Sequence, residues 1–496
     1  MKTGTLLDKI KSDFNGSGPK SVDRIIQVRI PPSHPALNTL SPPVDLKAAT
    51  SLPESPSDSE EAWLDLIAKF KSQILSSFDA RVSQYEEDVK GKDAQRALPG
   101  WNFCTFFVLK EGLARAFESV GLVEDALILY DELGFGLEAI VKEQEKGEVI
   151  GGKFIGWTKE GLHWIEEARK SMMARKSTED DGKPVDEIDE SPAIDAEKKP
   201  YRELILSNEI SIFDFRCYLF ARQATMLLRL GRRLQDQNAK PGDQFNEDDL
   251  ARLAEVCNRG LAFITTVARV LRADLNAGYQ GSTEHPEDKD DDPVVSRDEL
   301  RAVIDNLVTS WTYSACIQLL SQTASSALPA GLDENTNRGL LPRRTSSISP
   351  EALSFAQAVQ GKITGLEELA AGRAELMLLA RTVVEEAVGK RGWEGRNHWY
   401  GVCGTDEPTE MTEVDLNDDT PTKPKNAAIW LLEGIRNRDL KTVLDGEDAQ
   451  KFYDLFGDLS EKAMRYYGVA KRYKSAERVE SDLAALKLWA LHQSKA

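Results

Sequence analysis

The sequence contains little histidine and little cysteine, the side chains that most often bind transition metals. It has five of each, and both kinds are spread along the 496 residues. No CxxC pair occurs, and no histidines form HExxH or HxxxH, so neither a zinc knuckle nor a helical metal site is indicated. We therefore expect no metal ion. We expect reduced, partly buried thiols of the kind found in cytosolic proteins at Cys104, Cys217, Cys257, Cys316 and Cys403.

Clustered positive charge and long apolar runs are also missing. The net charge of −19 argues against a nucleic-acid partner, because binding to phosphates requires clustered lysine and arginine. No run reaches the roughly 18 apolar residues of a membrane span, and the N-terminus has no apolar core of a signal peptide. The sequence therefore predicts neither a transmembrane segment nor a secretory leader.

Strand-forming sequence is scarce as well. The segment VDRIIQVRI, residues 22–30, is rich in β-branched residues and predicts one strand. A single strand is not stable alone, so we interpret residues 1–45 as the remnant of a preceding α/β region. A stretch rich in proline and serine follows, and we expect residues 46–60 to be a linker.

From residue 61 onward the pattern is that of helices. Trp63, Ile67, Phe70, Ile74 and Phe78 recur at steps of three and four, as on one face of a long helix. Further helices are predicted over residues 101–119, 123–145, 156–176, 206–235, 247–276, 296–326, 351–390, 426–439, 447–470 and 474–493.

Acidic and polar segments divide these helices into blocks. Segments with so few large apolar residues cannot bury enough surface to offset the entropy lost on ordering. The expected blocks are 61–176, 201–327, 351–400 and 426–496, separated by an acidic disordered insert at 177–200, a flexible loop at 328–350 and an acidic linker at 401–425.

Two helix pairs carry the same weak repeat. Small and large residues fall at offsets that resemble the tetratricopeptide pattern, in which a small residue lets two helices approach closely. The usual Trp, Gly and terminal Pro are absent from both copies. The predicted fold is mainly α, a helical-hairpin, degenerate TPR-like solenoid with long acidic disordered inserts. The matching positions are Leu113, Ala114, Phe117, Ala126, Tyr130 and Leu133 in one copy, and Ala463, Met464, Tyr467, Ala476, Glu480 and Leu483 in the other.

Aromatic residues are crowded at the start of the first of these pairs. They could contact a ligand, a membrane or neighbouring helices, and the helical spacing after them favours packing between helices. We therefore predict a structural helix-pair joint formed by Trp101, Phe103, Phe106, Phe107, Ala114, Phe117, Ala126 and Tyr130.

Catalytic motifs are missing or incomplete. The segment GEVIGGKF, residues 147–154, satisfies G-x-x-x-x-G-K, but Phe154 stands where a phosphate-binding loop needs a hydroxyl, and no strand precedes it. No G-x-S-x-G is present. We therefore expect no catalytic residue, no cofactor and no enzyme activity.

Two further segments leave alternatives open. Residues 208–233 are apolar around most of a helix, which fits either a buried core helix or an exposed groove for a partner. In RRTSSIS, residues 343–349, two arginines precede Ser346 at a spacing that basophilic kinases accept, so Ser346 is a candidate phosphorylation site.

Several segments together resemble one family, the large subunit specific to the TRAPP II complex, subunit 10 of the transport protein particle. The resemblance lies in residues 4–15, 74–89, 101–133, 211–228 and 471–486, and WNFCTFFVLKEGLARAFESVGLVEDALILYDEL is its most specific part. The insert-rich loops suggest a fungal member. Family members have an α/β region before the first of these segments and β-sandwich domains after the solenoid, so we expect a truncated chain.

The resemblance implies a role in membrane traffic. It implies a scaffold subunit that supports Rab GTPase nucleotide exchange and vesicle tethering, with other TRAPP subunits as partners and the Rab contacted indirectly, through the assembled complex. It also implies a cytoplasmic protein, peripheral at the trans-Golgi and early endosome. A peptide-binding helical-repeat adaptor outside that complex is the alternative, and an enzyme is a third reading.

Overall fold

The computed structural model describes residues 3–15, 23–26, 56–147, 151–152, 154–177, 191–232, 247–282, 297–329, 364–389, 393, 395–404, 432–445 and 449–493. Over these ranges the chain forms fourteen helices and, apart from isolated β-bridges, no strand. The expectation of a mainly α fold is confirmed. The chain divides into two compact units, which we call the N-terminal unit, residues 1–95, and the main unit, residues 96–496.

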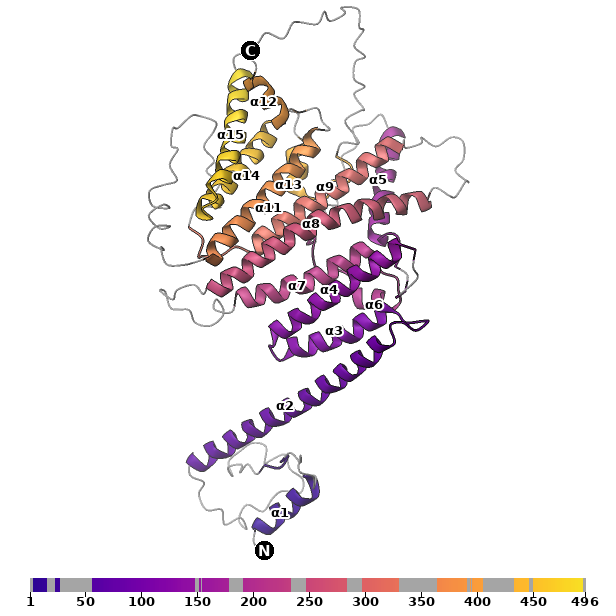
Figure 1. Ribbon diagram of the computed structural model, residues 1–496, viewed down its shortest axis with the longest axis vertical. Coiled ribbons are helices and arrows are strands. Elements are labelled where there is room, and N and C mark those ends of the chain that lie inside the picture. The colour runs from indigo at the N-terminus through magenta and orange to yellow at the C-terminus, as the bar shows by residue number, and fades with distance from the viewer. Residues whose placement is uncertain are drawn as a thin grey trace, which may run out of the picture. The chain divides into compact units, whose positions relative to one another are not determined.

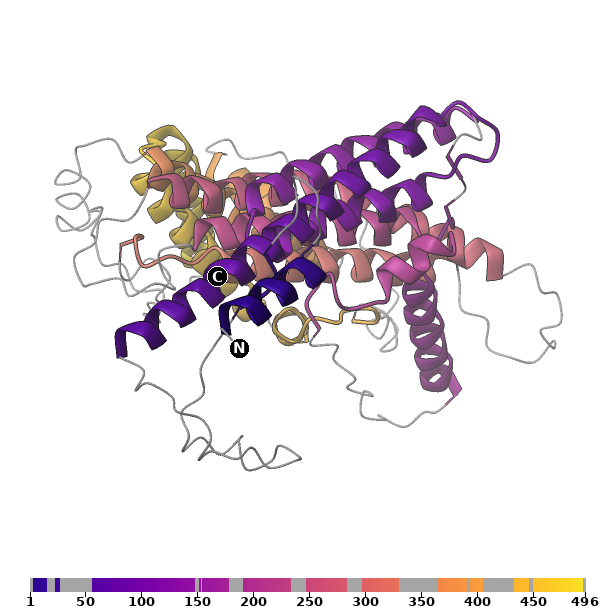
Figure 2. The ribbon, with the colours of Figure 1, turned by 90° about the horizontal axis from the view of Figure 1, so that it is seen from below.

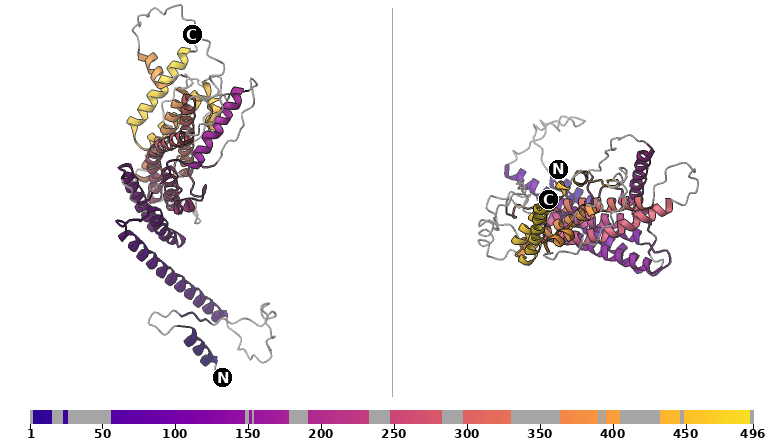
Figure 3. Two further views of the ribbon diagram at one scale, coloured as in Figure 1. Left: turned by 90° about the vertical axis from the view of Figure 1, so that its right-hand side faces the viewer. Right: turned by 90° about the horizontal axis from the view of Figure 1, so that it is seen from above.

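The N-terminal unit contains α1 (Thr3–Phe14) and α2 (Pro56–Ala94), the latter an unbroken helix of 39 residues (Figure 3). Two expectations need correction. Residues 23–26 form no strand, because the Arg24 amide donates to the Asn15 side chain and the Ile25 amide to the Asp23 carboxylate, and the other residues of the expected strand lie outside the described ranges. The linker expected over 46–60 ends early, because α2 already begins at Pro56, a residue well suited to the first turn of a helix.

The main unit is built from helices that pack in series (Figure 1). In the order of contact these are α3 (Phe103–Ser119), α4 (Val123–Glu145), α7 (Ile212–Gly231), α8 (Glu247–Ser282), α11 (Thr364–Gly389), α14 (Gln450–Val469) and α15 (Tyr473–Gln493). α9 (Arg297–Gln322) packs against both α8 and α11. α5 (Lys159–Ser177) runs across the direction of α8 and α9 and contacts both (Figure 2).

The helix predicted over residues 206–235 begins later than expected, at Ile212. α6 (Tyr201–Leu206) ends before a short turn in which Asn208 has a φ of 57°, and α7 begins only after Ser211. The Ser211 hydroxyl accepts a hydrogen bond from the Asp214 amide at 3.0 Å, as an N-cap does. The chain therefore changes direction over three polar residues, Ser207, Asn208 and Glu209, which come before the apolar helix α7.

The disorder expected for residues 177–200 is wrong for its last ten residues. Residues 191–200 pack on the main unit, where the Ile194 amide donates to Gln318 at 3.0 Å and Gln318 Nε2 donates back to the Ile194 carbonyl at 2.7 Å. Lys199 binds Asp214 at 2.7 Å. We call residues 191–200 the docked segment. The residues before it, 178–190, lie outside the described ranges.

The helix expected over 426–439 is also wrong in its described part. Residues 432–437 have no helical structure, because the Arg436 and Asn437 amides donate to the Ser310 hydroxyl on α9, both at 2.9 Å. α13 (Arg438–Leu444) starts directly afterwards, with Asn437 as its N-cap.

A buried arginine joins the C-terminal helices, among which α14 and α15 lie side by side (Figure 3). Arg381 on α11 binds Asp482 on α15 at 2.8 Å, donates to Ser460 on α14 at 3.0 Å and lies over the Phe456 ring. α12 (Arg396–Gly404) adds Tyr400, whose hydroxyl donates to Asp482 at 2.7 Å. One ion pair thus fixes four helices to each other.

Candidate functional site: the joint between α3, α4 and α7

The joint begins at the N-terminus of α3. The Asn102 side chain accepts a hydrogen bond from the Thr105 amide and donates to Asn208 at 2.7 Å, so one residue caps α3 and holds the turn before α7. The Phe103 amide donates to the Gly151 carbonyl at 2.8 Å. Gly151 has a φ of 85°, and a Cβ there would lie 2.9 Å from Ile140 on α4, so only glycine fits this close approach.

The aromatic residues predicted for the joint lie together inside it. Phe103 and Phe107 are 1% and 0% exposed, and both rings contact Phe215 on α7, at centroid distances of 6.0 and 4.7 Å. Phe106 is buried against Trp101 at 5.8 Å. The group therefore packs within the protein, between α3 and a helix more than 100 residues further along the chain.

The remaining predicted residues lie along the contact between α3 and α4. Ala114, Ala126 and Tyr130 are fully buried, whereas Phe117 is only half-buried. The turn between the helices is closed by a hydrogen bond from the Leu122 amide to the Phe117 carbonyl at 3.0 Å. In this bond the amide of the sixth residue donates to the carbonyl of the first. Such a bond is typical of a helix that is followed by a residue with left-handed backbone, here Gly121.

The hairpin of α14 and α15 closes in the same way. The Arg472 amide donates to the Tyr467 carbonyl at 2.9 Å, and Lys471 has a φ of 56°. Each of these positions is 350 residues after its counterpart in the α3–α4 hairpin, the same offset that relates the two weak repeats in the sequence. The two hairpins therefore share their turn geometry as well as their small-residue spacing.

Charged residues on α3 pair with cations on α6 and α7. Glu111 is fully buried, accepts a hydrogen bond from Arg202 Nε at 2.8 Å, and also accepts one from the Tyr218 hydroxyl. Burial and the nearby Glu111 carboxylate raise the pKa of the Tyr218 hydroxyl well above its usual range. Tyr218 therefore remains a neutral hydrogen-bond donor at any physiological pH.

A second carboxylate one heptad further along α3 repeats this arrangement. Glu118 binds Arg222 and also Arg229, the latter at 2.9 Å. Arg222 Nε donates to the Tyr130 hydroxyl at 2.9 Å, and its guanidinium lies over the Tyr130 ring. Arg222 thus connects α3, α4 and α7, which makes it the centre of the polar part of the joint.

A third set of pairs extends the joint from α4 to α7 and α8. Arg259 on α8 forms two hydrogen bonds with Asp131, at 2.6 and 3.0 Å, and Arg216 on α7 forms two with Glu138, both at 2.8 Å. Paired, planar contacts of this kind fix orientation as well as distance. The apolar joint therefore lies within a frame of ion pairs that the aromatic pattern did not indicate.

Phe154 of the phosphate-loop pattern and four of the five cysteines lie in the packed interior of the main unit. Phe154, at the hydroxyl position of the phosphate-loop pattern, is buried against Phe215, and the Gly152 carbonyl accepts a hydrogen bond from Gln144. Burial raises the pKa of Cys104 to about 12 and that of Cys257 to about 11, as expected for buried free thiols. Ser346 lies outside the described residues.

The described ranges contain neither a metal site nor a membrane-spanning helix. No group of three His, Cys, Asp or Glu residues there is arranged to hold a metal ion. None of the helices described is both long enough and apolar enough to cross a membrane.

Comparison with known proteins finds relatives over about half of the chain. It is 28% identical to trafficking protein particle complex subunit 10 of Dictyostelium discoideum over 278 residues, 54% of this chain and 16% of that protein. It is 29% identical to the Mus musculus subunit 10 over 234 residues, 46% of this chain and 14% of that protein. The Arabidopsis thaliana homologue of the complex II-specific subunit 130 is 30% identical over 209 residues, 42% of this chain and 12% of that protein.

No protein-family model and no solved structure matches the chain. The matches span less than a fifth of the relatives' own length, and all of them carry the name of one kind of subunit. Over about half of its length the chain is therefore a homologue of trafficking protein particle (TRAPP) complex subunit 10 and of the TRAPP II-specific subunit 130.

Proposed function

We propose that this chain acts as a non-catalytic scaffold subunit of the TRAPP II complex. In this role it supports Rab GTPase nucleotide exchange and vesicle tethering at the trans-Golgi and early endosome, as a cytoplasmic protein held at the membrane through the complex. The observation that carries the proposal is the sequence identity with relatives named as subunits of that complex.

The way charged side chains are used in the main unit supports a structural role. Glu111, Glu118, Asp131 and Glu138 each bind an arginine from another helix, and the buried Asp482 binds Arg381. Catalytic groups need a cleft in which they can reach a substrate, whereas these groups are used to join helices. Such pairs suit a protein that must keep its shape while other subunits bind to it.

The exposed face of α2 supports an assembly role. Trp63, Ile67, Phe70 and Ile74 are 52–61% exposed, and large apolar patches of this kind are typical of surfaces that another protein covers. Exposed acidic residues, such as Glu61, adjoin the first turn of this face. We therefore propose that the exposed face of α2 binds another TRAPP subunit. The contacting surface of that subunit would be apolar, with basic residues at its edge that face the acidic residues of α2.

Affinity purification tests the proposal. The tagged chain, expressed in its own cells from its own locus, is expected to co-purify with the other TRAPP subunits in near-equal amounts by mass spectrometry. Recovery of the intact chain with other proteins but without TRAPP subunits would instead favour an adaptor outside the complex, and the proposal would fail.

A pair of α2 variants tests the surface. Replacing Trp63 and Phe70 by Ser is expected to reduce recovery of the partner subunit, because it removes apolar area from the face. Replacing Lys71 and Glu87 by Ser, both exposed on the same helix, serves as the matched control and is expected to leave recovery unchanged. Equal recovery with both double variants would show that another surface makes the contact.

A further inference from the structure

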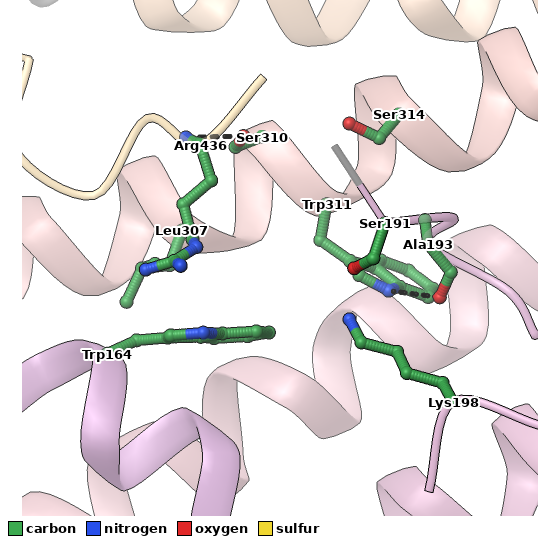
Figure 4. A pocket seen from close by; sticks show the side chains of 9 residues that line it. All are labelled: Trp164, Ser191, Ala193, Lys198, Leu307, Ser310, Trp311, Ser314 and Arg436. Carbon is green, nitrogen blue, oxygen red and sulfur yellow. Dashed lines mark hydrogen bonds between the residues drawn. The ribbon is translucent and has the colours of Figure 1, made fainter. Parts of the chain in front are cut away.

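A small pocket opens where four separate parts of the main unit meet (Figure 4). α5 contributes Trp164, α9 contributes residues including Ser310 and Ser314, the docked segment contributes Lys198, and the segment before α13 contributes Arg436. These parts come from positions up to about 270 residues apart in the sequence, so the pocket exists only in the folded unit.

Two cations line the pocket beside one indole ring. The Arg436 guanidinium lies 5.2 Å and the Lys198 ammonium 5.7 Å from the centre of the Trp164 ring, and both side-chain ends point toward the same space (Figure 4). Glu167 lies 3.3 Å from Arg436 and Glu160 lies 3.0 Å from Lys198, so each cation already has a carboxylate on one side. The indole and these carboxylates hold the two cations in place.

Two serine hydroxyls of the pocket accept hydrogen bonds from the segment before α13. Ser310 Oγ accepts from the Arg436 and Asn437 amides, both at 2.9 Å, which leaves its hydroxyl hydrogen to donate. Ser314 Oγ likewise accepts from Asn437 Nδ2 at 2.9 Å. Arg436 Nε is buried and donates to no protein acceptor. Ser310, Ser314 and Arg436 can therefore each donate a hydrogen bond toward the pocket.

A buried donor without an acceptor is unfavourable, so such a group indicates a ligand or an ordered water. The cavity volume is about 40 Å³, which is room for about three water molecules or for one small oxyanion, and not for a nucleotide. Two fixed cations favour an anion over water, because a charged acceptor forms much stronger hydrogen bonds with them than water does.

We propose that this pocket binds a single phosphate group, either as the free ion or as a phosphomonoester. The Arg436 and Lys198 side chains donate to it while they keep their Glu167 and Glu160 partners, the Ser310 and Ser314 hydroxyls donate to its oxygens, and the Trp164 ring forms one wall. Because the docked segment and the segment before α13 both line the pocket, a bound phosphate holds them on α5 and α9. Phosphate binding therefore stabilises the docked segment as well as the pocket.

Thermal unfolding of the full chain measures the binding. Inorganic phosphate, added at constant ionic strength to a phosphate-free buffer, is expected to raise the Tm progressively, while sodium chloride at the same ionic strength does not. Phosphoserine and glycerol phosphate in parallel titrations distinguish a phosphomonoester from the free ion. A Tm that responds to phosphate and chloride alike would overturn the proposal.

Charge-removing variants locate the site. Arg436→Gln and Lys198→Gln are each expected to weaken phosphate binding about tenfold or more. Lys170→Gln removes an exposed lysine of α5 and is expected to bind phosphate as the unaltered chain does. In fluorescence titrations, Trp164→Phe is expected to abolish the phosphate-dependent change. An undiminished response in both Arg436→Gln and Lys198→Gln would show that phosphate binds elsewhere.

A further pair of variants covers the case in which these substitutions unfold the protein. Ser191 also lines the pocket, so Ser191→Asp supplies a carboxylate in place of the ligand and Ser191→Asn is its uncharged control. The Asp variant is expected to have the higher Tm and to lose its response to phosphate, while the Asn variant keeps it. A lower Tm for Asp than for Asn, with the response to phosphate retained, would contradict the proposal.

Discussion

α2 and α3 carry apolar residues at the same helical spacing, yet one helix exposes them and the other buries them. Phe70 on α2 is 60% exposed, whereas Phe107 on α3 is 0% exposed. The difference lies in the neighbours. α3 packs against α4 and α6, and its Phe107 ring contacts the Phe215 ring on α7. An apolar period thus identifies the face of a helix that will be covered, but not what covers it.

The carboxylates of the two units differ in the same way. In the N-terminal unit, hydrogen bonds from Lys69 and Asn15 lower the pKa of Asp23, which is 41% exposed. In the main unit, burial and the neighbouring Asp214 raise the pKa of Asp274 to about 7. The first carboxylate is stabilised as an ion by its partners, and the second is destabilised as an ion by its surroundings.

Truncating one phenylalanine in each region tests the comparison most directly. Phe107→Ala removes a ring that is fully buried against Phe215, so the free energy of unfolding is expected to fall by about 3–5 kcal/mol. Phe70→Ala removes an exposed ring and is expected to change it by less than about 0.5 kcal/mol. Urea denaturation followed by circular dichroism measures both. Equal losses would mean that α2 is covered to the same degree as α3.

Neutralising Asp274 is expected to change how stability depends on pH. The folded-state pKa of about 7 lies above the ordinary aspartate value of 3.8, so the folded protein binds the proton more tightly. The free energy of unfolding therefore declines as the pH rises from about 4 to about 7. Within this range the decline is roughly 1.4 kcal/mol per pH unit. Asp274→Asn removes this decline. The Tm of the variant minus the Tm of the unaltered chain is therefore expected to be larger at pH 8 than at pH 5.

The groups that face Asp274 favour opposite effects on its pKa. Asp214 raises the pKa, whereas Ser211, the Phe213 amide and Arg216 lower it. The measured pH dependence of the Tm therefore reports the balance between these groups. Asp125→Asn makes the same chemical change at an exposed position of α4 and serves as the control. Parallel pH profiles for the two variants would show that Asp274 ionises in the folded state as freely as a surface carboxylate.

The sequence predicts the apolar part of the joint well and its polar part poorly. The period of three and four brings Phe103 and Phe107 onto one face of α3, and the small residue Ala126 indicates a close helix pair. The ion pairs have a weaker signal. Glu111 and Glu118 are seven residues apart, as are Arg222 and Arg229, which places each pair on one helix face, but nothing local shows that the faces meet.

The docked segment was missed for a different reason. Composition averages over a whole segment, so the acidic residues before it conceal Ile194 and Lys199, whose partners lie up to 124 residues away in sequence. The break before α7 did have a local signal, because Ser211 followed by Asp214 resembles an N-cap motif. Ser207, Asn208 and Glu209 are polar as well, so the sequence indicates in two ways that the helix begins after them.

Enlarging one alanine in each region tests close packing. Ala126 is 0% exposed on α4, so Ala126→Phe overpacks the helix pair and is expected to lower the free energy of unfolding by about 1–3 kcal/mol. Ala80 is exposed on α2, and Ala80→Phe is expected to change it by less than about 0.5 kcal/mol. If the Tm of Ala126→Phe matches that of the unaltered chain, Ala126 does not set the distance between α3 and α4.

The smallest effect is expected in the N-terminal unit, at Asp23. Its carboxylate accepts hydrogen bonds from Asn15 at 2.7 Å and from the Ile25 amide at 3.2 Å, and Lys69 on α2 lies 2.8 Å away. The lowered pKa means that its contribution to stability is present above pH 3.8 and is lost as the pH falls below that value.

Asp23→Asn is therefore expected to leave the Tm of the main unit unchanged and to speed hydrogen exchange of the Ile25 amide at pH 6, because the Lys69 contact is lost. The same substitution at pH 3 is expected to matter less, since the Asp23 carboxylate of the unfolded chain has by then begun to protonate, whereas the folded one, with its lowered pKa, stays ionised. Exchange at Ile25 that is equally protected in both proteins at pH 6 would mean that α2 does not depend on this ion pair to hold residues 23–26. The α2 helix would then differ from α3 in two ways: its apolar face is exposed, and its ion pair does not hold a neighbouring segment in place.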